Sequence, residues 1–365
     1  VVAEPELMYT IDDNDQPRLA FKIGIESNKG SPFFGRDFAM LGREPFSVMI
    51  DAMTHELIMD VPMYHKALNR KVYDDKHTTQ LPGTLVRSEG DGVVSSDSVA
   101  NQAYNNAGNC YYFYYNVFQR DSWNNQGAAL NSTIHYDVGY NNAFWNGEQM
   151  VYGDGDGKIF SDFANDLSVI CHELSHAVTQ STSNLRYWAE SGALNEGFSD
   201  IMGSSAVVYT QNPRFDTPNP SSSWIIGSNC TLVNLNPAGC PTCPAGIRYM
   251  DNPILDGQSK DYYPEKYNGV QDNRGVHLNS GIANLAYVLT VQGGVHPQWK
   301  TNIYVNAIGI QSAQQIYYIG FTHYLTSTST FADAHTATVQ AAKALGYSIS
   351  VQNSVNNAWL AVGVQ

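Results

Sequence analysis

The alternation of apolar and polar positions changes character along the chain and divides it into parts. In residues 1–60, the segments MYTIDDNDQPRLAFKIGIES and PFSVMIDAMTHELIMD alternate apolar with polar residues, which predicts short strands with turn-rich joins. Residues 70–165 mix strand patterns with one aromatic-rich helix near 97–120. The remainder is mostly helical, with Gly and Pro at the joins and helices expected over 166–183, 191–210, 277–292 and several stretches within 310–362.

Composition indicates a folded globular chain. Hydrophobic residues make up 43% and charged residues only 15%, and 365 residues are enough for two or three compact units. The formal net charge is −14, and no basic stripe is found, so nucleic acid is not an expected partner. The sequence has no apolar run of about 18 residues, the length that a membrane-spanning helix needs, so we expect no membrane span.

The segment VICHELSHAVTQ (169–180) carries the strongest chemical signal. His172 and His176 are four residues apart, so on a helix both imidazoles lie on one face and can bind one metal ion. HExxH on a helix is typical of zinc peptidases, with the Glu, here Glu173, as general base. A second HE pair at His55-Glu56 is followed by Met59 where the second His would stand, so we do not interpret it as a metal site.

A catalytic zinc site takes three protein ligands and leaves one position for water. The third ligand is predicted to be Glu196, twenty residues after His176, on a second helix through SGALNEGFSD. Asp200 lies one turn further along that helix and is expected to accept the free N–H of a ligand His.

Five cysteines give an odd count. Cys230, Cys240 and Cys243 crowd a loop rich in Pro and Gly, where a short disulfide is expected in an oxidising compartment; a second metal site is the alternative. Cys171 is expected to be a buried thiol, and Cys110 a core residue.

Beyond HExxH, four blocks carry a family resemblance: YNNAFWNGEQMVYGDGDG (140–157), RYWAESGALNEGFSD (186–200), AGIRYMDNP (245–253) and DNRGVHLNSGIANLAYVL (272–289). With these blocks the chain resembles the thermolysin family of zinc neutral proteases from about residue 70 to Gln365. The resemblance implies an α+β fold with a β-rich lobe, an α-helical lobe and the zinc cleft between them. We expect the β-rich catalytic lobe over 61–183, ending in the HExxH helix, and the α-helical lobe over 184–365.

The same resemblance assigns further roles. Tyr187 and His277 would stabilise the negative charge of the tetrahedral intermediate, and Asp272 would orient His277. Asn195 would orient His176 from behind the metal site. Tyr152 and Trp145 are expected to be structural aromatics.

Substrate contacts also follow from the resemblance. Asn142 and Ala143 would pair with extended substrate backbone, and Arg248 would donate to a substrate carbonyl, with a surface salt bridge as the alternative for this Arg. The pocket for the residue after the scissile bond would be lined by Phe160, Phe163, Val169 and Ile247. We therefore predict cleavage on the amino side of Leu, Phe, Ile or Val, with Leu favoured over Phe because Phe163 is bulkier than the Leu usual in the family.

The chain departs from the family pattern at the paired calcium site and before His277. The positions of the calcium-binding acids hold Ser168, Val207, Ile225 and Ser228, so we predict that this site is absent. Arg274 replaces a small residue, and its guanidinium could perturb His277 or occupy a subsite.

Residues 1–60 resemble the last part of the prosegment that precedes mature proteases of this family; a β-rich N-terminal piece of the mature enzyme is the alternative. If residues 1–60 are a prosegment, we expect the enzyme to cleave its own chain within 61–70. The released prosegment could stay bound to the mature enzyme. The sequence starts at Val1 and shows no charged and apolar regions of a secretory signal. We expect a secreted, extracellular protein from which such a signal, if any, was removed before this sequence begins.

The function predicted from the sequence is a secreted zinc endopeptidase acting on protein and peptide substrates. An inactive peptide-binding relative and a structural zinc protein are the alternatives. The complete set Glu173, Tyr187 and His277 argues against the first alternative, and the open fourth zinc position argues against the second.

Overall fold

The computed structural model describes residues 6–11, 17–25, 46–51, 57–62, 68–94, 96–211 and 224–365. The chain forms two compact units, Val1–Ala67 and Leu68–Gln365. The expected pair His55-Glu56 lies outside the described residues.

The first unit contains a four-stranded antiparallel sheet in the order β1-β2-β3-β4. Its strands are β1 (Glu6–Ile11), β2 (Pro17–Ile25), β3 (Phe46–Asp51) and β4 (Leu57–Pro62). β2 and β3 fall within the two segments of alternating pattern, and β1 and β4 overlap them and extend two residues beyond, so the prediction of short strands is confirmed.

The sheet of the second unit has the order β6-β5-β7-β9-β8. It is formed by β5 (Arg70–Asp74), β6 (Thr84–Ser88), β7 (Leu130–Ile134), β8 (Ala143–Trp145) and β9 (Met150–Tyr152). β5, β7 and β9 are parallel neighbours, whereas β6 and β8 are antiparallel strands at the edges. This arrangement leaves one side of β8 without a strand neighbour in the sheet, beside the cleft described below.

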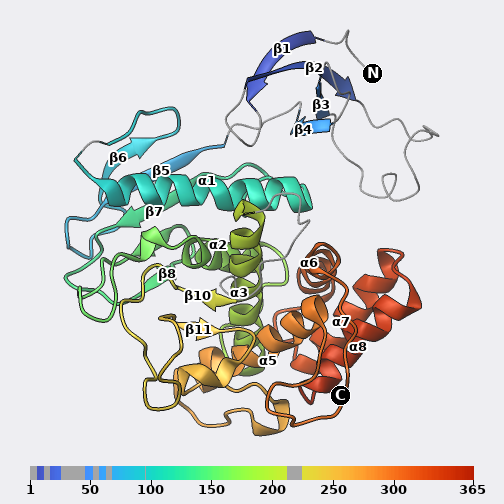
Figure 1. Cartoon of the computed structure of the whole chain (residues 1–365). Helices are drawn as coiled ribbons and strands as arrows, with labels where there is room; N and C mark the ends of the chain where they lie inside the picture. Colours follow the sequence, from blue (N-terminus) through green and yellow to red (C-terminus); the bar gives the residue numbers. More distant parts are fainter. Residues whose placement is uncertain are drawn as a thin grey trace. The chain divides into compact units, whose positions relative to one another are not determined.

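Helix α1 (Ser98–Phe118) packs on this sheet (Figure 1). Asp97 begins it, because its side chain accepts hydrogen bonds from the backbone N–H groups of Val99 and Ala100. Its buried face is rich in aromatic and small residues, as the pattern near 97–120 predicted.

Two long helices connect the sheet to the helical part of the unit (Figure 1). α2 (Leu167–Ser181) packs against α3 (Ala189–Gln211), which in turn packs against α5 (Asp272–Gln292). The helical part continues with α6 (Ile310–Ile319), a π-helical turn (Gly320–Tyr324), α7 (Phe331–Ala344) and α8 (Ile349–Ala361). Two short strands, β10 (Ile225–Ile226) and β11 (Arg248–Tyr249), pair antiparallel nearby. The expected helices are therefore present, except that α5 starts earlier, at Asp272, through a stretch with non-helical backbone angles.

The cysteine predictions are partly wrong. Cys171 is not a thiol: it forms a disulfide with Cys110, because α1 and α2 pack with both residues fully buried and their Cα atoms 5.4 Å apart. The expected short disulfide joins Cys240 to Cys243, so these sulfurs are not available to a metal. Cys230 is a buried free thiol.

None of the helices in the described part of the chain is long and apolar enough to cross a membrane.

Candidate metal centre and substrate cleft

The HExxH residues lie on α2, where Asp166 caps the N-terminus by accepting hydrogen bonds from the backbone N–H groups of Ser168 and Val169. His172 and His176 are on the same face, and their Nε2 atoms are 3.0 Å apart. Both rings are held through Nδ1. His176 Nδ1 donates to Asn195 Oδ1 at 2.8 Å, and His172 Nδ1 lies 2.9 Å from Asp200 Oδ1. The two Nε2 lone pairs therefore face each other, which is unfavourable unless a cation lies between them.

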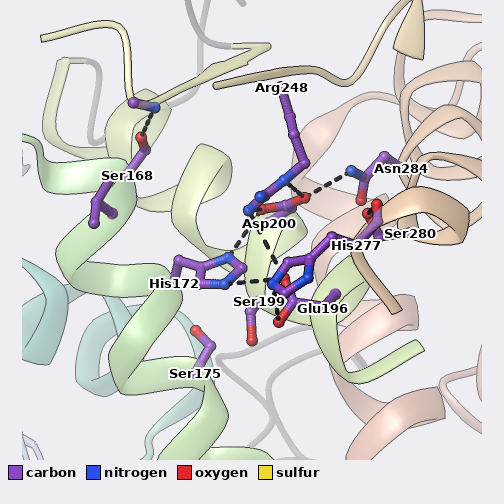
Figure 2. Close-up of polar contacts among 12 residues, drawn as sticks. Ser168, His172, Ser175, Glu196, Ser199, Asp200, Arg248, His277, Ser280 and Asn284 are labelled. Carbon is purple, nitrogen blue, oxygen red and sulfur yellow. Dashed lines mark hydrogen bonds and ion pairs between the residues drawn. The ribbon is translucent and has the colours of Figure 1, made fainter. Parts of the chain in front are cut away.

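Glu196 reaches the same point from α3 (Figure 2). Its carboxylate oxygens lie 3.4 Å from His172 Nε2 and 3.3 Å from His176 Nε2. Glu196 is 1% exposed, and its Oε2 is buried without a hydrogen-bond partner in the described residues. A buried carboxylate oxygen without a donor needs a positive charge nearby.

These three residues fit a zinc ion. Tetrahedral zinc with bonds of about 2.0–2.1 Å keeps its ligand atoms about 3.4 Å apart. The separations of 3.0, 3.3 and 3.4 Å are close to that value, and the donor set is the His₂Glu set of catalytic zinc sites.

The supporting residues are mostly those that the sequence predicted. Asn195 Nδ2 donates to Leu185 O at 3.0 Å, which fixes the amide that holds His176. Ser199 also contacts His176 Nδ1 at 3.2 Å, a residue that was not predicted from the sequence. Ser199 is one helical turn after Asn195 on α3, and this spacing is the signal that points to it.

Asp200 connects the metal centre to Arg248 (Figure 2). Nε and Nη2 of Arg248 donate to its two carboxylate oxygens at 2.8 and 2.6 Å, and Asn284 Nδ2 donates at 2.8 Å. Although burial acts in the opposite direction, Arg248 and His172 hold the pKa of Asp200 well below its usual range. The ion pair that the sequence considered as an alternative for Arg248 is thus present, but it is buried. Arg248 also lines the cleft.

On the other side of the metal centre, Tyr187 and His277 are in contact. The Tyr187 hydroxyl donates to Glu196 Oε1 and lies 3.0 Å from His277 Nε2. Asp272 holds His277: its Oδ1 is 2.6 Å from His277 Nδ1, and its Oδ2 accepts the backbone N–H of His277 at 2.8 Å. Burial opposes the charged form of His277, but the charge of Glu196 and the bond to Asp272 raise its pKa above the ordinary value.

Glu173 is buried beside the two His and lines the cleft. Burial raises the pKa of Glu173, partly offset by His172 and His176. Its place among the residues that line the cleft fits the general-base role predicted from the sequence.

The cleft has a volume of about 820 Å³ and contains the centre at its floor. Of the expected apolar pocket residues, Phe163, Val169 and Ile247 line it. Phe160 is not among the lining residues; its ring packs against that of Phe163, with centroids 5.2 Å apart. Ile226 lines the pocket in addition to the expected set.

Asn142 and Ala143 lie along the rim of the cleft, at the start of β8. Because β8 is an edge strand, its outer backbone groups can pair with an extended peptide. Trp145, expected to be only structural, also lines the cleft, and its Nε1 donates to Gln180 Oε1 at 2.7 Å; Tyr152 is buried in the core as expected.

Arg274 is exposed, has a positive φ of 67° and lies 5.6 Å from the ring of Trp188, which is half exposed. No carboxylate pairs with it in the described residues. His277, three residues further along the chain, and Tyr187, next to Trp188, both line the cleft.

Two of the positions where the family resemblance would place calcium-binding acids, Ser168 and Ile225, are buried within the protein. The buried Ser168 hydroxyl donates to Asp166 and accepts the backbone N–H of Gly227 at 3.0 Å. Ile225 belongs to β10 and is buried.

Two family models match this chain. The thermolysin metallopeptidase catalytic domain matches residues 43–180, and the thermolysin metallopeptidase alpha-helical domain matches residues 183–364. The fold and the metal centre thus define a zinc metallopeptidase architecture, and the chain belongs to the thermolysin metallopeptidase family.

Similar proteins include a thermostable neutral protease of Geobacillus stearothermophilus, with 44% identity over 80% of this chain and 50% of the relative. A bacillolysin of Bacillus cereus is 42% identical over 80% of this chain and 48% of the relative. The chain spans about half the length of these curated relatives. Among solved structures, the precursor of protealysin, a metalloproteinase from Serratia proteamaculans, is similar with a TM-score of 0.69 and 33% identity, covering 83% of this chain and 89% of that one.

Proposed function

We propose that this chain is a secreted zinc-dependent endopeptidase. The observation that carries the proposal is the convergence of His172, His176 and Glu196 beside a buried Glu173 at the floor of a large cleft. A structural zinc protein is less consistent with this arrangement, because such sites use four protein ligands and have no need of an open cleft.

In the proposed mechanism, His172, His176 and Glu196 would hold a zinc ion, whose Lewis acidity would polarise the scissile carbonyl and lower the pKa of a water. Glu173 would take a proton from the attacking water and pass it to the leaving amine. Tyr187 and His277 face the same point and donate hydrogen bonds to the oxygen that becomes negative. Asp272 keeps the His277 ring oriented for this task.

Casein hydrolysis before and after removal of metal tests the activity. We expect hydrolysis that a zinc chelator abolishes and added zinc restores. A fully zinc-loaded protein that binds peptides but does not cleave casein would instead support an inactive peptide-binding relative.

We propose cleavage on the amino side of Leu, Phe, Ile or Val. Phe163, Val169 and Ile247 form an apolar wall of the pocket for that residue. Arg248 lines the same cleft, and we propose that its guanidinium donates a hydrogen bond to the substrate backbone. A digest of a peptide library measures the preference. Leu above Phe is expected, since Phe163 narrows the pocket; a preference for charged residues at that position would contradict the assignment.

We also propose that residues 1–60 are a prosegment, removed by self-cleavage within 61–70. Two observations support this: residues 1–67 form a compact unit of their own, and the similar solved structure is that of a precursor. N-terminal sequencing after incubation tests it. Wild type should lose the segment, whereas Glu173→Gln should keep it. If both keep the intact N-terminus while wild type is fully active, residues 1–60 are a permanent part of the enzyme.

A further inference from the structure

A second cluster of metal-binding side chains lies outside the cleft, at one edge of the larger sheet. β5, β7 and β9 are adjacent parallel strands, so their carboxyl ends meet at that edge. His77 follows β5, His135 follows β7, and Asp154 follows β9. Each of three neighbouring strands thus delivers one potential ligand to the same place.

The donor atoms of these three residues all lie within 4.8 Å of one another. Asp154 Oδ2 is 2.8 Å from His135 Nδ1 and 3.5 Å from His77 Nδ1. Zinc with bonds of about 2.0–2.1 Å keeps its ligand atoms about 3.4 Å apart, so small adjustments suffice to bind it. The backbone N–H of His77 donates to His135 O at 2.8 Å, which ties the two loops together behind the imidazoles.

Both His have positive φ, 59° at His77 and 53° at His135. Such angles are uncommon in residues other than Gly and persist where the surrounding structure demands them. With this backbone the two imidazole rings lie with their centroids 5.5 Å apart. If the strands simply continued in an extended conformation, no left-handed residues would be needed here.

The surroundings are rich in negative charge. Asp97 Oδ2 lies 3.3 Å from His135 Nε2. Asp162 has a buried Oδ1 without a hydrogen-bond partner in the described residues, and burial together with the charge of Asp154 raises its pKa to about 6. Three carboxylates face two imidazoles, and a dication would balance them.

An ion pair alone explains part of the cluster. A protonated His135 between Asp154 and Asp97 is stabilised, and the hydrogen bond to Asp154 is the main reason that its pKa rises to about 9. This explanation gives no role to His77, whose Nδ1 lies 3.3 Å from Asp137 O and 3.5 Å from Asp154 Oδ2.

We propose that His77, His135 and Asp154 form a second metal site, which takes zinc or a similar borderline divalent transition ion and fixes the ends of the three strands. Imidazole and carboxylate ligands suit such ions. The side chain of His77 is 53% exposed, so ions can enter from solvent and water can complete the coordination. None of the three residues lines the cleft, so the site acts on the fold and is independent of the proposed peptidase chemistry.

Metal content per chain tests the proposal, measured by mass spectrometry after equilibration of the full chain with low micromolar free zinc. Wild type should hold two zinc ions. His77→Ala should hold one and keep its peptidase activity, Glu196→Ala should hold one, and the double variant none. His323→Ala, which removes an exposed His outside both clusters, is the matched control and should keep two.

Thermal unfolding gives a second readout. Zinc added to Glu196→Ala protein should raise its melting temperature, and the rise should disappear in the double variant. The proposal is overturned if His77→Ala binds as much zinc as wild type, or if His323→Ala loses as much as His77→Ala does. In either case the cluster is only an ion pair between His135 and its two carboxylates.

Discussion

Four consecutive residues at the start of α5, Asp272 to Gly275, have positive φ. Three of them are not Gly, and Arg274 stands where the family has a small residue. The left-handed turn places Asp272 under His277, so the backbone conformation serves the position of the His277 ring.

The cost of this turn can be measured at Arg274. Gly has no side chain that opposes a positive φ, whereas Ala has a Cβ atom. The free energy of unfolding of Arg274→Gly should therefore be about 1 kcal/mol larger than that of Arg274→Ala. The Ala variant is the matched control, because both changes remove the cation–π contact with Trp188. Denaturant unfolding measures the difference. Equal stabilities would mean that the turn carries no strain at this residue.

At the residue scale, His172 and His176 could be predicted because helical periodicity brings them to one face of α2. Glu196 lies on α3, so its meeting with them depends on the packing of α2 against α3; it was predicted from a sequence block that resembles the family. Phe160 could not be placed correctly. Its pairing with Thr231, far away in the sequence, sets its direction, and no local pattern encodes that contact.

At the scale of elements, the disulfide between Cys110 and Cys171 joins α1 to the helix that carries the metal ligands. The sequence could not predict this pair, because the two cysteines are 61 residues apart and the contact depends on how α1 crosses α2. The helices themselves were predictable to within a few residues, since each carries its own apolar periodicity and several have a capping residue or Gly at an end, such as Asp97 before α1 and Gly293 after α5.

Removal of this disulfide should destabilise the enzyme. The closed loop of 61 residues limits the unfolded chain, so Cys110→Ala with Cys171→Ala should lower the unfolding free energy by up to about 4 kcal/mol. Cys240→Ala with Cys243→Ala is the control. It opens a loop with a separation of only 3, for which the same reasoning gives about 1.6 kcal/mol. Denaturant unfolding of the two double variants should rank them in that order; the opposite order would contradict the entropic account.

At the scale of the whole molecule, the lack of carboxylates at Ser168, Val207, Ile225 and Ser228 leads to a prediction about calcium. Calcium binds through several oxygen ligands, usually carboxylates. The buried bonds of Ser168 with Asp166 and Gly227 support the region without an ion. A calcium-selective chelator should therefore change the melting temperature little. A large fall, reversed by added calcium, would show that the paired site exists with other ligands.

The architecture of the larger unit was predictable because its motifs follow the family order from β8 to α5. The β-rich and helical parts match the prediction, and the cleft contains most of the expected residues. The compact units divide at Ala67, and the expected boundary at residue 60 stays a prediction.

In the proposed mechanism, Glu196 helps to bind zinc, whereas Glu173 transfers the proton and does not bind the metal. Measuring zinc content and casein hydrolysis together in Glu173→Gln and Glu196→Ala tests this division of roles most directly. Glu173→Gln should keep the zinc of the cleft and lose at least about 10²–10⁴-fold in rate, since only the general base is removed. Glu196→Ala should lose both that zinc and the activity. A Glu173→Gln protein with near-wild-type hydrolysis would contradict the mechanism.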